Sequence, residues 1–169
     1  MSETTPIEPD ADEEWEAVTW QARPASHADV PAVAAAVSEL LVELGGKPAA
    51  IPALEEATKA LIDDPHAGAV LVVEDEGEIV GTIGVSWQHA IRIPGRYGLI
   101  QELWVHPRRR TKEIGGDLLL ALFGLARERG IGRIEVGLPS ERYPHLAATE
   151  SFYLNNGFTT IGVRMRRLV

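Results

Sequence analysis

The sequence contains no cysteine. This absence excludes a disulfide framework, a zinc site built on thiolates and catalysis by a cysteine nucleophile. No stretch approaches the ~20 consecutive apolar residues that a membrane-spanning helix needs. The N-terminus is acidic and lacks the basic start and apolar core of a signal peptide. We therefore expect a cytoplasmic protein that has no membrane partner.

Motifs of several enzyme classes are missing as well. The five histidines show no metal-binding spacing such as H-E-x-x-H, so no metal site is predicted. There is no G-x-S-x-G elbow of a serine hydrolase. Neither the Walker A phosphate loop nor the G-x-G-x-x-G dinucleotide fingerprint occurs.

Negative charge is concentrated at one end of the chain. The formal net charge of the 169 residues is −9, and residues 1–18 hold seven carboxylates without a single Lys or Arg. Removing those seven leaves −2 for the remainder. Acidic character disfavours nonspecific nucleic-acid binding, which depends on neutralising phosphates. We expect an acidic, disordered tail over 1–17 and one domain over 18–169.

Hydrophobic periodicity and turn residues predict alternating strands and helices. The predicted strands are 20–23, 69–75, 78–88, 97–105, 133–138 and 158–168, and 89–96 is a predicted loop. The first predicted helix begins after Ser26 and ends near Leu44. The other predicted helices cover 53–63, 112–129 and 147–156. Strands 97–105 and 133–138 are joined through a helix and should run parallel. The expected fold class is α/β, with a mixed, mostly antiparallel central sheet and helices on both faces.

The junction between strand 97–105 and the following helix is strongly basic. Its sequence, VHPRRRTKEIGG, covers residues 105–116. Unpaired N–H groups and the dipole at a helix N-terminus attract anions, and glycines let the backbone approach a ligand. The junction is therefore either a diphosphate site or a solvated basic loop, and local features favour neither.

A second group of residues, TESFYLNNGF, covers 149–158. It predicts a short helix closed by a glycine. Within it, Tyr153 is either a buried aromatic residue of the core or a general acid that donates its phenolic proton to a developing anion.

Together these two stretches resemble the GNAT superfamily of N-acetyltransferases, over about 18–169. Residues 110–115 fit the family's R-x-x-G-x-G/A loop, and 152–158 fit its F-Y-x-x-x-G-F motif. The resemblance implies a GNAT-type fold and transfer of an acetyl group from acetyl-CoA, with coenzyme A as product. The acceptor it implies is a primary amine of a small molecule or peptide, which attacks directly in a ternary complex.

The resemblance also assigns the residues that bind the coenzyme. The backbone of one strand is implied to pair with the pantetheine arm, and the N–H of Val105 to face the thioester oxygen. That strand segment is Leu103, Trp104 and Val105. The backbone of the following loop is implied to hold the diphosphate. That loop is Arg110, Thr111, Lys112, Glu113, Ile114, Gly115 and Gly116.

Two side chains match the family's acid–base positions. By resemblance, Glu102 removes a proton from the amine, commonly through water, and Tyr153 protonates the departing thiolate. The alternative for Glu102 is a polar residue on a half-exposed strand face, and the alternative for Tyr153 is a core aromatic residue.

One departure from the family pattern concerns the diphosphate loop, where Glu113 replaces the first glycine. A carboxylate at a helix N-terminus competes with a diphosphate for the same N–H groups. Our hypothesis is that Glu113 turns outward, pairing with Arg109 or Arg110, and that coenzyme binds more weakly than with glycine. The alternative function is a catalytically weak or inactive acyl-CoA-binding sensor domain.

The acceptor is not specified by the sequence. A polyamine, an amino acid, an aminoglycoside-like amine and a protein N-terminus all remain open. The resemblance further implies a homodimer formed through the C-terminal strand, residues 163–169.

Overall fold

The computed structural model describes residues 20–110, 113–162 and 165–168. The acidic tail predicted over 1–17 lies outside these residues. The sheet strands are β1 (Ala22–Pro24), β2 (Gly68–Asp75), β3 (Glu78–Ala90), β4 (Ile93–Val105) and β5 (Ile134–Val136). The α-helices are α1 (Val30–Glu43), α2 (Ile51–Asp63), α3 (Ile114–Glu128) and α4 (Leu146–Asn155), and short 3₁₀ turns cover His27–Asp29 and Pro107–Arg109.

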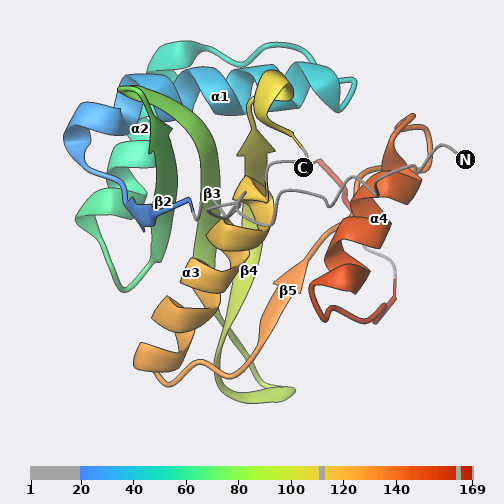
Figure 1. Ribbon diagram of the computed structural model, residues 1–169. Coiled ribbons are helices and arrows are strands. Elements are labelled where there is room, and N and C mark those ends of the chain that lie inside the picture. Colours follow the sequence, from blue (N-terminus) through green and yellow to red (C-terminus); the bar gives the residue numbers. More distant parts are fainter. Residues whose placement is uncertain (1–19, 111–112, 163–164, 169) are drawn as a thin grey trace, which may run out of the picture.

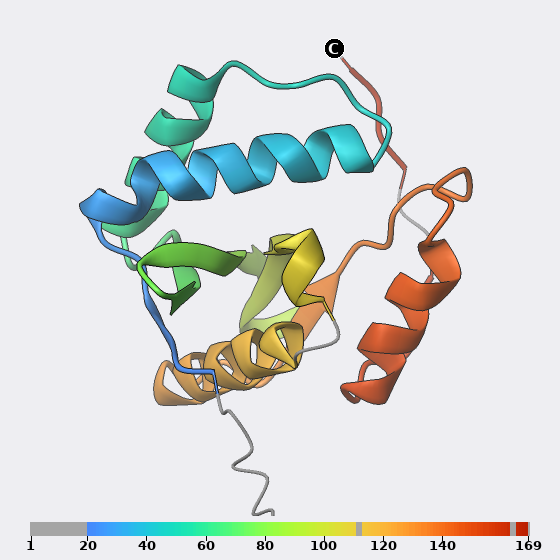
Figure 2. The ribbon, with the colours of Figure 1, turned by 45° about the horizontal axis from the view of Figure 1, so that its top comes forward.

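The five strands form one sheet in the order β1-β2-β3-β4-β5. Neighbouring strands are antiparallel except β4 and β5, which are parallel and connected through α3. Helices α1 and α2 cover one face of the sheet, and α3 covers the other (Figures 1 and 2). The predicted mixed, mostly antiparallel sheet with helices on both faces is confirmed.

The larger core lies under α3. Apolar residues of α3 at helical spacing, among them Leu118 and Leu122, are fully buried against the sheet. A smaller cluster on the opposite face joins Val33 of α1 to Val70 and Val72 of β2. Successive residues of a strand point to opposite faces, so β2 supplies Leu71 and Val73 to the larger core and Val70 and Val72 to the smaller one.

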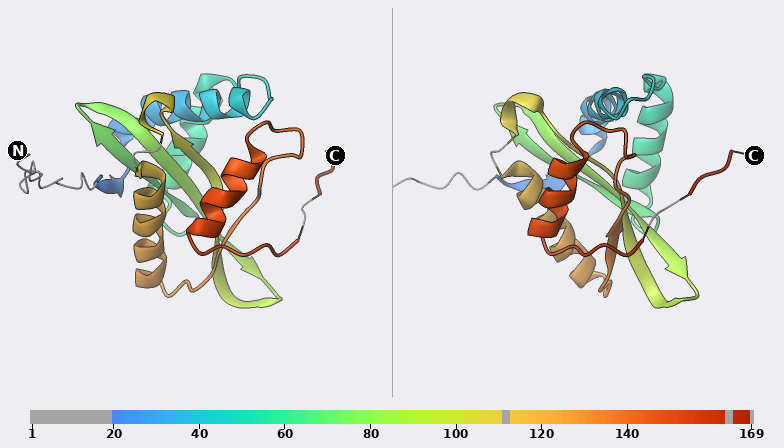
Figure 3. Two further views of the ribbon diagram at one scale, coloured as in Figure 1. Left: turned by 45° about the vertical axis from the view of Figure 1, so that its right-hand side comes forward. Right: turned by 90° about the vertical axis from the view of Figure 1, so that its right-hand side faces the viewer.

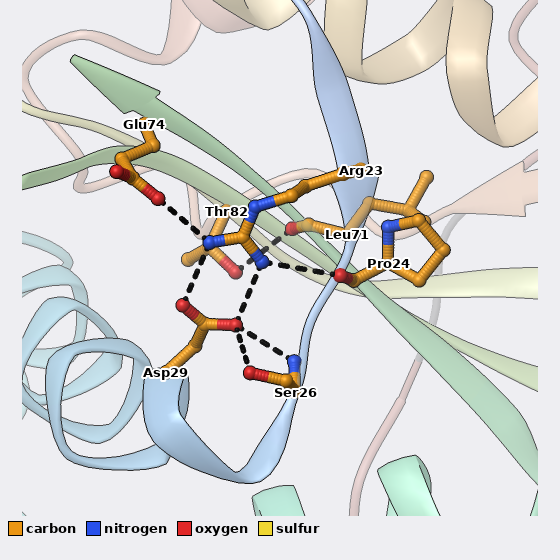
Figure 4. Close-up of polar contacts among 7 residues, drawn as sticks. All are labelled: Arg23, Pro24, Ser26, Asp29, Leu71, Glu74 and Thr82. Atoms are coloured by element: carbon orange, nitrogen blue, oxygen red, sulfur yellow. Dashed lines mark hydrogen bonds and ion pairs between the residues drawn. The ribbon is translucent and has the colours of Figure 1, made fainter. Parts of the chain in front are cut away.

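An ion-pair cluster fastens the start of α1 to the sheet (Figure 4). The Arg23 guanidinium donates to both carboxylate oxygens of Asp29, at 2.8 and 2.9 Å, and to Glu74 at 2.8 Å. Asp29 also accepts the backbone N–H of Ser26 at 2.7 Å, as a helix-capping carboxylate does. Because the Arg23 guanidinium donates hydrogen bonds to it, the pKa of Asp29 is held well below the ordinary value, although burial by itself would raise it.

Two sequence predictions were wrong. The loop predicted over 89–96 is the tip of a long hairpin, in which Ala90 pairs with Ile93 and only Ile91 and Arg92 form the turn. This arm projects beyond the rest of the sheet (Figure 3). The short β5 pairs with β4 only at Gly98–Ile100. Pro94 is tolerated in the arm because no strand lies on that side of it to accept a hydrogen bond from the N–H that proline lacks.

The second error is the strand predicted over 158–168. None of the described residues in that range, 158–162 and 165–168, lies in a strand. Beyond Phe158, which packs against the core, their large apolar side chains are exposed, with Ile161 at 72%, Met165 at 97% and Leu168 at 84%. A strand requires a partner for its backbone groups, and β5 offers only three residues. Residues 163, 164 and 169 of the predicted dimer segment lie outside the described residues.

Candidate functional site

The candidate site lies where β4 and β5 separate. Their pairing runs from Gly98 opposite Ile134 to Ile100 opposite Val136, where β5 ends. Strand β4 continues alone on that side for five more residues, and Figure 1 shows the two strands diverging. The register between β3 and β4 shifts at the same point, where Gly84 pairs with Glu102 but Val85 pairs with Ile100. Gln101 is therefore the extra residue of a β-bulge.

The bulge sets the direction of the backbone groups beyond it. Before the bulge, the N–H of Gly98 donates toward the β5 side, to the Arg133 carbonyl at 2.9 Å. After the bulge, the N–H of His106 donates toward β3, to Val80 at 2.9 Å. Because amide directions alternate along an antiparallel strand, Trp104 also faces β3. Leu103 and Val105 therefore present their N–H and C=O groups to the side that β5 has left.

Glu102 comes from the same stretch and points to the α1–α2 face. Its carboxylate lines a cavity of about 80 Å³ between those helices and the sheet. Gly84, its cross-strand partner, makes room for it, because a Cβ at that position would lie 2.5 Å from Oε2 of Glu102. Burial without a compensating partner raises the pKa of Glu102 to about 7. A carboxyl with that pKa takes up and releases protons near neutral pH.

Tyr153 reaches the opposite face of the sheet, in the core under α3. Only 7% of the residue is exposed, and its ring packs edge-on against Phe152 and Phe158, with 5.2 Å between ring centroids in each pair. Burial raises the pKa of Tyr153 to about 12. Its hydroxyl therefore stays protonated at neutral pH and remains able to donate.

The N-terminus of α3 meets α4 and the end of β4 at Gly115. A Cβ at this position would lie 3.1 Å from Cζ of Phe152 and 3.8 Å from Cγ2 of Val105. The glycine therefore permits close packing of the three elements that carry the predicted coenzyme residues. Ile114 is fully buried, whereas Gly116 is partly exposed. Thr111 and Lys112 lie outside the described residues.

Glu113 adopts the left-handed backbone conformation, with φ of 64°, immediately before α3. This conformation favours glycine, the residue that the family pattern has here. The Glu113 side chain is exposed and makes no capping hydrogen bond to the helix. The expected pairing is not found, because Arg109 pairs with Asp75 and Arg110 pairs with Glu43.

A cluster that the sequence did not indicate joins Glu43, Arg110 and Tyr143. The Arg110 guanidinium donates to both Glu43 oxygens, at 2.7 and 2.6 Å, and its Nε donates to the Val105 carbonyl at 3.1 Å. The Tyr143 hydroxyl donates to Glu43 at 3.1 Å. Hydrogen bonds from Arg110 lower the pKa of Glu43. The cluster ties the end of α1 and the segment before α4 to the β4–α3 loop.

Replacing Glu43 tests how much this cluster stabilises the fold. We expect Glu43→Gln to lower the free energy of unfolding by about 0.5–1 kcal/mol at neutral pH, because Arg110 and Glu43 are partly solvated. Since folding lowers the pKa of Glu43, the difference should be present above about pH 4.5 and vanish as the pH falls below it. Urea denaturation at several pH values measures it.

The matched control is Glu39→Gln, at an exposed position one turn earlier on α1. It should change the free energy of unfolding by less than about 0.5 kcal/mol. Equal effects of the two substitutions would show that the Arg110 contact contributes nothing specific.

Among the described residues, no three His, Asp or Glu side chains gather in a way that could hold a metal ion. Within the same residues, no helix is both long and apolar enough to cross a membrane.

Comparison with known proteins agrees with this geometry. The sequence model described as "Acetyltransferase (GNAT) family" matches residues 34–158, which is more than half of the chain and includes the β4–α3 loop and Tyr153. No curated protein matches the sequence.

Solved structures with the same fold come from several sources. An integron cassette protein, HFX_CASS3, from the Cole Harbour salt marsh metagenome is 24% identical, with a TM-score of 0.73 over 88% of this chain and 90% of its own. A GCN5-related N-acetyltransferase from Ralstonia eutropha JMP134 is 18% identical, with a TM-score of 0.70 over 88% and 97%. A predicted acetyltransferase from Clostridium acetobutylicum, solved with acetyl-CoA, is 18% identical, with a TM-score of 0.70 over 88% and 95%. At these identities the likeness shows the fold.

Proposed function

The chain belongs to the acetyltransferase (GNAT) family, and we propose that it transfers the acetyl group of acetyl-CoA to a primary amine of a small molecule. Acetyl-CoA supplies the acetyl group as a thioester, and the amine nitrogen takes the acetyl carbon from sulfur within one ternary complex. The role of the protein in such a reaction is to position both substrates and to handle two protons.

The backbone around the β4–β5 separation fits the coenzyme. Leu103 directs its backbone N–H and C=O, and Val105 its N–H, to the open side of β4, where the pantetheine arm would add like a strand, while the Val105 carbonyl already accepts from Arg110. The Val105 N–H is the proposed donor to the thioester oxygen. The first turn of α3 and the loop before it would hold the diphosphate, and the side chain of Glu113 leaves those N–H groups uncapped.

The two proton-handling residues approach this strand from opposite faces of the sheet. Glu102, on the α1–α2 face, accepts the proton of the ammonium group directly or through water. Tyr153, on the α3 face, donates its proton to the departing thiolate. We propose that the amine binds on the α1–α2 side, and the cavity that Glu102 lines there supports this.

The observation that carries the proposal is the combination of the free Leu103–Val105 edge with the desolvated Glu102 carboxyl on the same strand segment. The test is release of free coenzyme A thiol from acetyl-CoA in the presence of primary amines, with the N-acetyl product identified by mass spectrometry. We expect release that depends on the amine. Bound acetyl-CoA without release for any amine would favour the sensor function instead.

The exposed Glu113 predicts a gain in affinity when its charge is removed. Glu113→Gly should lower the Kd for acetyl-CoA about two- to fivefold, because it removes a negative charge worth about 0.3–1 kcal/mol beside the diphosphate. Titration calorimetry measures the change. Glu113→Gln removes the charge but keeps the side chain in the left-handed conformation, so it separates charge from backbone strain. Unchanged or weaker binding by both variants would contradict the proposed diphosphate site.

A further inference from the structure

The cavity beside Glu102 has mostly apolar walls. Its apolar side chains come from both helices and from β2. They are Val33 and Val37 of α1, Leu54, Ala57 and Leu61 of α2, and Val70. A ligand that fills this space must therefore have an apolar body.

The other polar side chains of the cavity carry no charge and donate their hydroxyl protons within the chain. The Thr58 hydroxyl donates to the Leu54 carbonyl at 2.7 Å, and the Thr82 hydroxyl donates to the Leu71 carbonyl at 3.2 Å (Figure 4). Glu102 is the one ionisable residue of the lining. A ligand can thus be bound by one charge-assisted contact, and a second charged group would lie against apolar walls without a partner.

The size of the cavity limits the apolar body. Its volume of about 80 Å³ is roughly half of the ~150 Å³ that holds benzene in an engineered apolar cavity. A chain of about three carbon atoms fits this space, whereas a sugar ring or an extended polyamine exceeds it.

We propose that the acceptor is a small primary alkylamine, whose ammonium group contacts Glu102 while its short carbon chain fills the cavity between α1, α2 and the sheet. This inference rests on the proposed acetyl transfer and names its acceptor class. It disfavours amino acids, because their carboxylate would be held near Glu102, and it disfavours diamines, because their second ammonium group would enter the apolar end.

A homologous series of amines tests the proposal. With methylamine, ethylamine, propylamine and butylamine, kcat/KM should rise about fourfold for each added methylene until the cavity is full, near propylamine. Glycine and putrescine should be at least about tenfold poorer than propylamine. A flat series, or a preference for glycine or putrescine, would overturn the alkylamine proposal and leave acetyl transfer intact.

Two alanines of α2 provide matched variants. Both are exposed, and Ala57 lines the mouth of the cavity whereas Ala60 does not contribute to the lining. Ala57→Leu should flatten the chain-length series and reduce kcat/KM for propylamine about tenfold. Ala60→Leu should preserve both. Equal behaviour of the two variants would overturn the proposal.

A binding measurement separates failure of the cavity proposal from failure of catalysis. In methyl NMR spectra, propylammonium should shift signals of Val33, Val37 and Val70 in the wild type but much less in Ala57→Leu. If no amine releases coenzyme A, the proposed function fails. The spectra then still show whether propylammonium binds in the cavity. Absence of shifts in the wild type would overturn the alkylamine site whatever the turnover.

Discussion

Glu102→Gln should lower kcat/KM for the amine by about 100-fold or more, since a positioned general base contributes about 10²–10⁴ in rate. The substitution keeps the shape of the side chain and removes its ability to accept a proton. Because the pKa of Glu102 is raised to about 7, the wild-type base is protonated and inactive below that pH. The measurement is kcat/KM of both proteins between pH 5.5 and 9.

The two pH profiles together isolate Glu102. An alkylamine, like a lysine side chain, is an ammonium ion throughout this pH range, so kcat/KM of the wild type should rise through about pH 7, as Glu102 ionises, and level off above it. The variant can use only the small fraction of neutral amine, so its kcat/KM should keep rising with pH. A wild-type profile that runs parallel to that of the variant, without a plateau above pH 7, would exclude Glu102 as the base.

The stability of the same variant distinguishes a loss of catalysis from a loss of folding. Folding raises the pKa of Glu102 from 4.5 to about 7, so the folded state binds more protons between these values. The wild type therefore becomes less stable as the pH rises through that window. Glu102→Gln lacks this loss, and at pH 8 it should be more stable than the wild type by about 1–2 kcal/mol.

A second substitution moves the carboxylate without removing it. Gly84→Ala would place a Cβ 2.5 Å from Oε2 of Glu102, so the side chain must shift. Activity should fall, but less than in Glu102→Gln. Unchanged activity would mean that the observed position of the carboxylate is unimportant.

Tyr153→Phe should lower kcat by about 100-fold while the Kd for acetyl-CoA remains within about twofold, because only the proton donor to the thiolate is removed. The ring and its contacts with Phe152 and Phe158 remain, so the core should stay packed. Because the pKa of Tyr153 is about 12, the wild type should show no fall in kcat from this residue below about pH 11. Steady-state kinetics and calorimetry measure both quantities.

The control is Tyr97→Phe, in the hairpin part of β4. Tyr97 is half-buried and has the Arg92 guanidinium 5.9 Å from its ring centroid. This variant should retain kcat within about twofold. If Tyr153→Phe retained kcat equally well, Tyr153 would be a core aromatic residue and another group would protonate the thiolate.

Local patterns predicted most of the fold, because helices α1 to α3 and the central strands contain a complete hydrophobic period and an end signal. Helix α3, for example, was predicted from its apolar face and ends beside Gly130 as expected. The prediction of a strand over 158–168 failed because the alternation of apolar residues does not show whether a neighbouring strand is available for pairing. The prediction of a loop over 89–96 failed because Pro94-Gly95 is a typical turn sequence that is also tolerated on an unpaired strand end.

The candidate site was predictable only in part for a related reason. The family-like motifs marked Glu102, Tyr153 and the loop that includes Arg110. Glu43, however, lies 67 residues before Arg110, and nothing in its own surroundings distinguishes it from other glutamates of the chain. The cavity beside Glu102 is likewise made by five separate elements, so its size and apolar walls exist only in the folded chain.

The single extra residue in β4 has a consequence for how this strand tolerates change. Ile100, before it, and Leu103, beyond it, both belong to the core under α3, although an uninterrupted strand would point them to opposite faces. The bulge at Gln101 thus shifts the odd–even count of the strand. Removing Gln101 would leave the faces of Ile100, Glu102 and Leu103 unchanged, because their pairing with β3 would become regular. Adding one more residue beside Gln101 would let a regular strand run through it and would exchange an acid for a core leucine, which is a graver change than any single replacement along the strand.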